Sequence, residues 1–395
     1  MPVPTDDSRR GGLPGTPPRF VVVLASAGLV ALTGAAVWLL PAEAGPPGGL
    51  AAGSTAPAVG SATELAGMER QRRLVVLPPE RRPSGYVTYV HTASEPRFSP
   101  AAEMRRTGVR WYALGHLTAG PDGCTPKWGG TTDQGRDPVA NRLARLRAAG
   151  GDVSLLFGGG GGRELAETCA DTRALTAAYR RVIGAFDPPH IDFELAAPPA
   201  SVPLPAGSGG AATGPGQGDP RPMGTALPLP PQGAAAAQRE PASAVRRARA
   251  LRALKRQAMS EGRSLDVGFT VPAGASGLAE GHRAVLRATR GAGGPVDTVT
   301  LLVPLRRTPD SSQLRRLAES VRVSRAQIAA DLGLSPLDAS RRIALTPVLA
   351  GPGDLSPMEA RKLSAYAMRN QLAWLSLRGA RPAEAVVRTL SSAHL

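Results

Sequence analysis

The sequence has few aromatic residues: Phe, Trp and Tyr together make up 4% of its 395 residues. A surface that stacks the bases of single-stranded nucleic acid needs more aromatic side chains than this. The chain is basic, with 47 Lys and Arg against 31 Asp and Glu and a formal net charge of +16. The positive residues are spread over several expected helices, so we expect no nucleic-acid partner. We interpret the most basic helix, 243–261, as a solvated face beside an acidic neighbour, with an anion-binding patch as the alternative.

Large apolar residues are scarce in two stretches that are rich in Gly, Pro, Ala and Ser. The first covers residues 41–67 and lies within an expected flexible linker, 41–84. The second, 197–242, is too poor in hydrophobic residues to fold alone, and we expect a disordered insertion there.

Charged residues are missing altogether between residues 20 and 40. An uncharged run of this length can span a bilayer. Three arginines among residues 1–19 predict that this tail is cytoplasmic and that everything after the run lies outside. An A-x-A pattern ends at Ala44, so a cleaved signal peptide is the alternative. We therefore expect a single-pass membrane protein with an extracellular body, or a secreted protein cut near Ala44.

Between residues 85 and 390, apolar strand-like runs alternate with amphipathic helix-like segments. The expected strands are 86–90, 109–117, 153–157, 190–196, 265–271, 298–303, 343–348 and 374–377. Helices are expected between them, including 138–149 and 173–186. Such alternation argues for a parallel sheet. Eight strands in about 260 residues, once the insertion is removed, predict the α/β class and a (β/α)8 TIM barrel.

The strand expected at 190–196 carries two carboxylates. Residues i and i+2 of a strand point to the same side, so Asp192 and Glu194 share one face. Both stand near the C-terminal end of the strand, where an α/β barrel keeps its chemistry. Two acids on a buried face are costly unless the site is wet or uses them. The alternative is a solvated or ion-paired acidic face without chemistry.

Only two cysteines occur, Cys124 and Cys169, both in the part expected to be exported. An even pair in an oxidising compartment predicts a disulfide. It would join the loop after the second strand to the helix after the third, and both segments lie on the C-terminal face of a barrel. Two buried free thiols are the alternative.

Two neighbouring segments carry a resemblance to a known family. Residues 113–120 read Ala-Leu-Gly-His-Leu-Thr-Ala-Gly, and residues 124–130 read Cys-Thr-Pro-Lys-Trp-Gly-Gly. Together they resemble the second strand and loop of actinobacterial family 18 glycoside hydrolases, the chitinases. Weaker similar pieces stand at 146–153, 157–159, 265–267, 296–299 and 346–348. The resemblance covers most of residues 85–380. It implies a (β/α)8 barrel, a polysaccharide or oligosaccharide partner, and neither a cofactor nor a metal.

Family 18 enzymes carry Asp-x-Asp-x-Glu at the end of the fourth strand. The Glu protonates the glycosidic oxygen, and the Asp before it turns the substrate's acetamido group toward the anomeric carbon, where its oxygen is the nucleophile. An ungapped alignment from Tyr179 puts Ala196 at the position of the acid. A shift by two residues makes Glu194 the acid and Asp192 the orienting residue. Both registers stay open at this point.

Other positions of the family motif are lost. Residues 302–306 read Leu-Val-Pro-Leu-Arg where the family has Met-x-Met-Asp-Tyr, and Leu156 replaces a Ser of the third strand. The resemblance makes Trp128 and Trp374 the candidates for sugar contact. We expect a chitinase-like protein of weak or no activity that binds a cell-surface glycan. The alternatives are an active glycosidase that cleaves N-acetylglucosamine-containing polysaccharide with Glu194 and Asp192, and a structural envelope protein.

Overall fold

The computed structural model describes residues 81–160, 162–195, 232–308 and 312–393, all within one unit, Leu77–Leu395. The predicted tail, the uncharged run 20–40, nearly all of the linker and most of the insertion lie outside the described residues. In the part that is described, none of the helices has the length and apolar character needed to cross a membrane.

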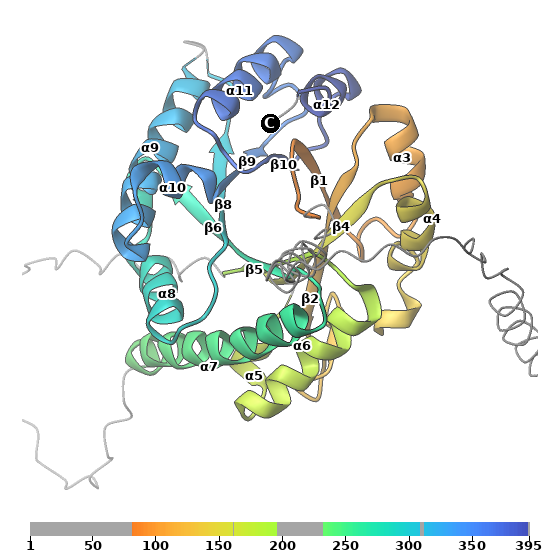
Figure 1. Ribbon diagram of the computed structural model, residues 1–395. Coiled ribbons are helices and arrows are strands. Elements are labelled where there is room, and N and C mark those ends of the chain that lie inside the picture. The colour runs from red at the N-terminus through yellow and green to blue at the C-terminus, as the bar shows by residue number, and fades with distance from the viewer. Residues whose placement is uncertain (1–80, 161, 196–231, 309–311, 394–395) are drawn as a thin grey trace, which may run out of the picture. The chain divides into compact units, whose positions relative to one another are not determined.

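Eight parallel strands form a closed barrel, as the alternating pattern predicts (Figure 1). The strands are β1 (Tyr86–His91), β2 (Trp111–Ala119), β4 (Asp152–Gly158), β5 (His190–Glu194), β6 (Asp266–Gly274), β8 (Thr298–Leu305), β9 (Ile343–Leu349) and β10 (Leu375–Gly379). The first strand, β1, pairs in parallel with both β2 and β10, and this double pairing closes the ring. The (β/α)8 barrel is therefore confirmed, and each expected strand is present with its ends moved by only a few residues.

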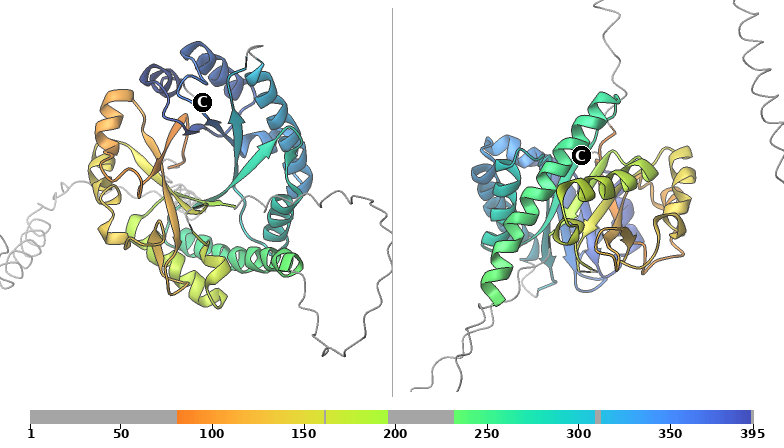
Figure 2. Two further views of the ribbon diagram at one scale, coloured as in Figure 1. Left: turned by 180° about the vertical axis from the view of Figure 1, so that it is seen from behind. Right: turned by 90° about the horizontal axis from the view of Figure 1, so that it is seen from below.

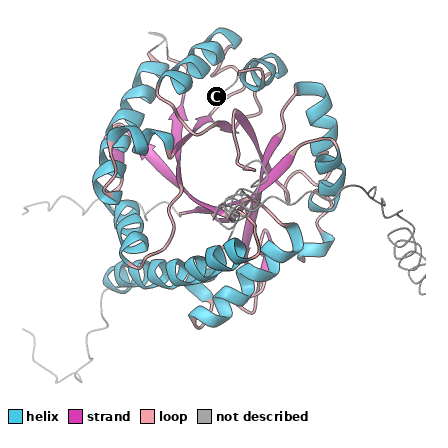
Figure 3. Ribbon diagram, viewed as in Figure 1, coloured by secondary structure: helices cyan, strands magenta, loops and turns pink. Residues whose placement is uncertain are grey.

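Helices surround the barrel on all sides (Figure 3). They are α3 (Pro100–Thr107), α4 (Leu143–Ala148), α5 (Leu165–Thr168), α6 (Thr172–Phe186), α7 (Gln232–Ser260), α8 (Glu280–Gly291), α9 (Gln313–Leu332), α10 (Pro336–Arg341), α11 (Pro357–Arg369) and α12 (Glu384–Ser391). Two 3-10 turns, η1 (Gln134–Arg136) and η2 (Ala140–Arg142), precede α4. Two short antiparallel strands extend the sheet, β3 (Pro126–Trp128) beside β2 and β7 (Gly277–Leu278) beside β6.

Two helix boundaries differ from the expectation. The segment 138–149 is a 3-10 turn followed by the short α4, because the Asp137 carboxylate accepts hydrogen bonds from the backbone N–H groups of Val139 and Ala140 and holds a tight turn there. The long α7 begins at Gln232, so residues 232–242 of the expected insertion are helical. It runs along the outside of the barrel between α6 and α8 (Figure 2).

The core has two layers. Between barrel and helices, the rings of Phe157, Tyr179, Phe193 and Phe269 pack in one aromatic cluster, with Phe157 and Phe193 stacked 5.2 Å apart. Inside the barrel a separate, smaller cluster contains Val87, Ala344 and Trp374. The outward-facing residues of β5 therefore belong to the main core, and its alternate residues are left to face the barrel interior.

Candidate functional site

Strand β5 carries Asp192 into the barrel interior, where hydroxyl groups hold it. Its Oδ1 accepts a hydrogen bond from Thr270 Oγ1 at 2.8 Å, and its Oδ2 accepts one from Thr300 Oγ1 at 3.2 Å. His190 Nε2 lies 3.7 Å from Oδ2. A Cβ at Gly268 would come within 2.7 Å of the same oxygen, so the neighbouring strand needs glycine at this position.

Glu194 is the last residue of β5, and its carboxylate contacts one side chain from each of two other barrel strands, β2 and β10. Its Oε2 lies 2.9 Å from His116 Nε2 and 2.6 Å from Arg378 Nη1. The pairing of β2 with β4 shifts by one residue between Gly115 and Leu117, and this bulge accompanies the inward position of His116. Arg378 comes from the last barrel strand, β10. Glu194 is therefore ion-paired, whereas Asp192 on the same face is held by threonine hydroxyls.

These contacts keep Glu194 ionised. Burial alone would raise the pKa of its carboxyl group, but the hydrogen bond to His116 and the charge of Arg378 outweigh burial and lower the pKa to about 2. An ionised carboxylate can only accept hydrogen bonds, so His116 Nε2 is the donor in its hydrogen bond to Glu194 Oε2. Near neutral pH, Glu194 has no proton to donate.

Arg378 is held by an aromatic ring as well as by the carboxylate. Its guanidinium lies 4.0 Å from the centre of the Tyr89 ring, within the range of a cation–π contact. The Tyr89 hydroxyl is 3.5 Å from His116 Nδ1. Burial raises the pKa of Tyr89 to about 12, although the charge of Arg378 acts in the opposite direction. The four side chains form one connected cluster.

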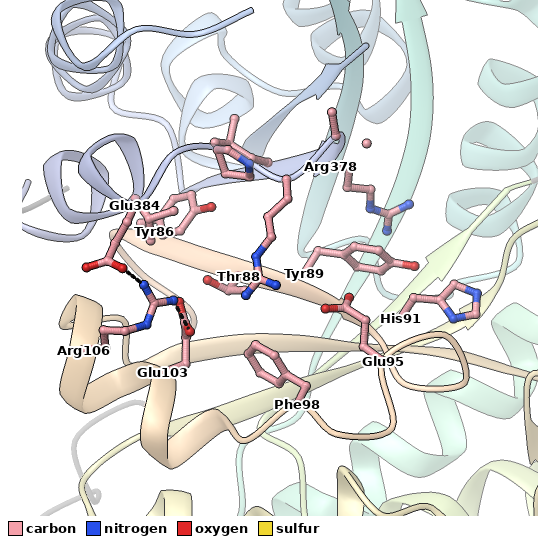
Figure 4. A pocket seen from close by; sticks show the side chains of 16 residues that line it. Tyr86, Thr88, Tyr89, His91, Glu95, Phe98, Glu103, Arg106, Arg378 and Glu384 are labelled. Carbon is pink, nitrogen blue, oxygen red and sulfur yellow. Dashed lines mark hydrogen bonds and ion pairs between the residues drawn. The ribbon is translucent and has the colours of Figure 1, made fainter. Parts of the chain in front are cut away.

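A pocket of about 720 Å³ opens beside this cluster, between β1, β10, α3 and α12 (Figure 4). At one end stand Tyr89, His91 and Arg378. At the other end Arg106 bonds to Glu103 and Glu384. Other lining residues include Tyr86, Thr88, Glu95, Phe98 and Arg381. The lining thus combines three aromatic rings with charged and hydroxyl groups, which suits a polar ligand with apolar faces.

The two tryptophans proposed for sugar contact lie elsewhere. Trp128 is fully buried in β3, and its ring packs 5.7 Å from the ring of Phe186, so its faces are closed to a sugar in this structure. Trp374 is 6% exposed and precedes β10, at the N-terminal end of the barrel, with its ring 5.2 Å from His190. Neither is brought to Glu194. Ala196, the rival candidate for the acid position, lies outside the described residues.

The predicted disulfide is confirmed. Cys124 and Cys169 are bonded, with their Cα atoms 4.7 Å apart, and they join the loop between β2 and β3 to the end of α5. Among the described side chains, no group of three or more His, Cys, Asp or Glu residues is placed to hold a metal ion.

Sequence reasoning gave no role to Arg378, His116 or Tyr89. His116 lies within the segment that carried the resemblance, but no motif singled it out. The available signal was position: Tyr89 and Arg378 each stand close to the C-terminal end of a barrel strand, where functional groups of this fold gather.

The fold matches that of solved chitinase domains. Neither a family model nor a curated protein matches the sequence. The catalytic domain of a hyperthermophilic chitinase from Pyrococcus furiosus has a TM-score of 0.58 and 17% identity, over 79% of this chain and 95% of that chain. A similar match is to catalytic-site mutants of active domain 2 of the thermostable chitinase from Pyrococcus furiosus, complexed with chito-oligosaccharides. The TM-score is again 0.58 and the identity 17%, over 79% of this chain and 96% of that chain. A second set of catalytic-site mutants of active domain 2 of the Pyrococcus furiosus chitinase has a TM-score of 0.57 and 18% identity, over 79% of this chain and 95% of that chain. The chain therefore has a family 18 glycoside hydrolase-like fold, as the resemblance implied.

Proposed function

We propose that this protein is a chitinase-like glycan-binding protein in which cleavage is impaired. The observation that carries the proposal is the contact of Glu194 with both Arg378 and His116. The fold resembles that of the chitinase domains, and Glu194, the candidate acid of one of the two registers, is held as an anion.

The low pKa of Glu194 is what impairs protonation of the glycosidic oxygen. General acid catalysis needs a group whose pKa lies near the working pH. A carboxyl group with a pKa of about 2 is protonated in about one molecule in a thousand at pH 5. Arg378 and His116 both contact the same carboxylate oxygen, Oε2, and this double contact favours the ionised form. The Asp and Tyr of the family's Met-x-Met-Asp-Tyr segment are also missing at residues 302–306, at the end of β8, and the resemblance implies that this Tyr supports the acetamido intermediate.

Binding is supported by the pocket beside Arg378. Its volume of about 720 Å³ lies within the range of small-ligand sites, roughly 300–1,000 Å³. Tyr89 and Phe98 offer aromatic surface, and His91 and Glu95 offer groups for sugar hydroxyls. The Pyrococcus furiosus mutants were solved with chito-oligosaccharides bound, which makes a chitin-like glycan the first ligand to test.

We further propose that the barrel acts outside the cell. The uncharged run 20–40 would anchor it in the membrane, or a cut near Ala44 would release it. The Cys124–Cys169 disulfide supports an oxidising compartment. Protease added to intact cells should digest the barrel, and complete protection of the chain would contradict this part of the proposal.

The test measures binding and turnover of the same labelled chito-oligosaccharide. We expect saturable binding with little or no release of product. The variant His91→Ala with Glu95→Ala should weaken binding, because both residues line the pocket, and the hydrophobic core is preserved because neither belongs to it. Robust turnover that is lost in Glu194→Gln would establish the active glycosidase instead. Absence of binding in the wild-type protein would leave the structural envelope role.

A further inference from the structure

A second concave surface lies on the outside of the barrel, between α9, α10 and α11. It encloses about 590 Å³. The lining residues are Arg315, Arg316, Ala318, Glu319, Val321, Arg322 and Arg325 from α9, Ser340 from α10, Tyr366 and Asn370 from α11, and Leu372. We call this surface the α9–α11 groove. It shares no residue with the pocket beside Arg378.

Arginines outnumber acidic residues in the lining of the α9–α11 groove. In the described part of the chain, Arg315 has no carboxylate partner, and Arg325 only donates a hydrogen bond to Ser340 Oγ at 3.3 Å. Arg322 pairs with Glu319 at 2.5 Å, but both side chains are more than half exposed, so this pair is weak. On the neighbouring helix α8, by contrast, Arg283 and Arg287 both bond to Asp331 of α9. The groove thus has an excess of positive charge.

The positive groups form a line along one helix. Arg315, Arg322 and Arg325 are spaced i, i+7 and i+10 on one side of α9. At 1.5 Å per residue they extend over about 15 Å, too far for a single small anion to contact all of them. On the facing wall, the Tyr366 hydroxyl donates a long hydrogen bond to Ala318 O at 3.5 Å, and Asn370 Nδ2 donates to Tyr366 O at 2.9 Å. The phenol oxygen and the amide oxygen of these neutral groups can still accept hydrogen bonds from a ligand.

We propose that the α9–α11 groove binds an acidic polysaccharide. Guanidinium groups bind carboxylates with two parallel hydrogen bonds, so a row of arginines fits a polymer with repeated carboxylates. The hydroxyl and amide groups on the opposite wall fit the hydroxyls between those carboxylates. Chitin carries no charge, so this ligand and this site differ from those of the proposed function and do not depend on it.

The experiment uses the full-length protein and a fluorescently labelled oligogalacturonate, followed by fluorescence anisotropy. The groove variant is Arg315→Gln with Arg322→Gln and Arg325→Gln. The matched control is Arg136→Gln with Arg163→Gln and Arg388→Gln, which removes the same charge from exposed arginines elsewhere. Inorganic polyphosphate and uncharged dextran serve as comparison ligands. The single variant Arg315→Gln provides the measurement if the triple variant does not fold.

We expect oligogalacturonate to bind more tightly than polyphosphate, and dextran not to bind. The groove variant should lose about tenfold or more in affinity, since each charged hydrogen bond contributes measurably. The control variant should lose less than the groove variant by several fold, and Tyr366→Phe should weaken oligogalacturonate alone. Equal losses in the two triple variants would overturn the site. Polyphosphate bound as tightly as oligogalacturonate would overturn the assignment of a polysaccharide.

Discussion

Two glutamate–arginine pairs stand on opposite sides of the barrel wall. Glu194 and Arg378 meet inside the barrel at 2.6 Å, and Glu164 and Arg247 meet between the barrel and its helices at 3.2 Å. Each arginine also lies over aromatic rings: Arg378 over Tyr89, and Arg247 over the two phenylalanines 193 and 269. The same chemistry therefore occurs twice in different surroundings.

The two pairs differ in their surroundings and in the other groups that bond to the glutamate. The side chains of Glu164 and Arg247 are 5% and 4% exposed, and Glu164 also accepts hydrogen bonds from the Tyr179 hydroxyl and the N–H of Ala166 at the start of α5. Glu194 instead contacts a histidine, and its arginine lines a pocket. The first pair serves packing, whereas the second keeps Glu194 ionised beside a pocket that Arg378 lines.

The largest effect is expected from Arg247→Met. It leaves the Glu164 carboxylate buried without a counter-charge, which typically costs about 3–5 kcal/mol of unfolding free energy. Urea denaturation measures this loss. Arg249→Met, an exposed position on the same helix, should change the free energy by less than about 0.5 kcal/mol. Equal stability of the two variants would show that the Glu164 pair has no structural role.

The second effect concerns the disulfide. Its Cys169 caps the C-terminus of α5, the helix whose N-terminus is capped by Glu164. Replacing Cys124 and Cys169 by serine opens a loop of sequence separation 45. The loss should be about 2–4 kcal/mol of unfolding free energy, measured by urea denaturation under non-reducing conditions. The pKa of Glu194 should not change, because the disulfide does not touch that pair. A change in that pKa would show that the two regions are coupled.

The third effect is a pH dependence carried by Glu194. Its pKa is lowered from 4.5 to about 2 on folding, so the folded state binds the proton less readily than the unfolded state. The stabilisation is therefore complete above pH 4.5 and is lost as the pH falls towards 2. Its size is at most about 3 kcal/mol. The difference in unfolding free energy between wild type and Glu194→Gln, followed over this range, isolates the contribution. A difference independent of pH would contradict the lowered pKa.

The smallest effect is a change in protonation with little change in fold. Arg378→Met removes the positive charge beside Glu194, so the pKa of this carboxyl group should rise by at least about one unit. Carboxyl-carbon NMR titration measures it directly. Arg381→Met also changes the pocket lining but does not contact Glu194, and it should leave the pKa near 2. A pKa that remains near 2 in Arg378→Met would assign the shift to His116 alone.

The local pattern predicted each strand and the shared face of Asp192 and Glu194, because alternation along a strand fixes which residues share a face. It did not predict Arg378, which lies 184 residues after Glu194 and meets it only when the ring closes. It could not place Trp128 either. An aromatic residue in a glycine-rich loop can face a ligand or pack inward, and here β3 folds back on β2 and buries it.

The closure of the ring has a consequence for how the chain is made. The first barrel strand, β1, pairs with the last, β10, so the two strands that close the ring are separated by nearly the whole barrel sequence. Until β10 has emerged from the ribosome, β1 and β9 each present an unpaired edge, and such edges associate readily with other chains. A chain that stops before Leu375 would keep both edges open and would therefore be prone to associate with other chains.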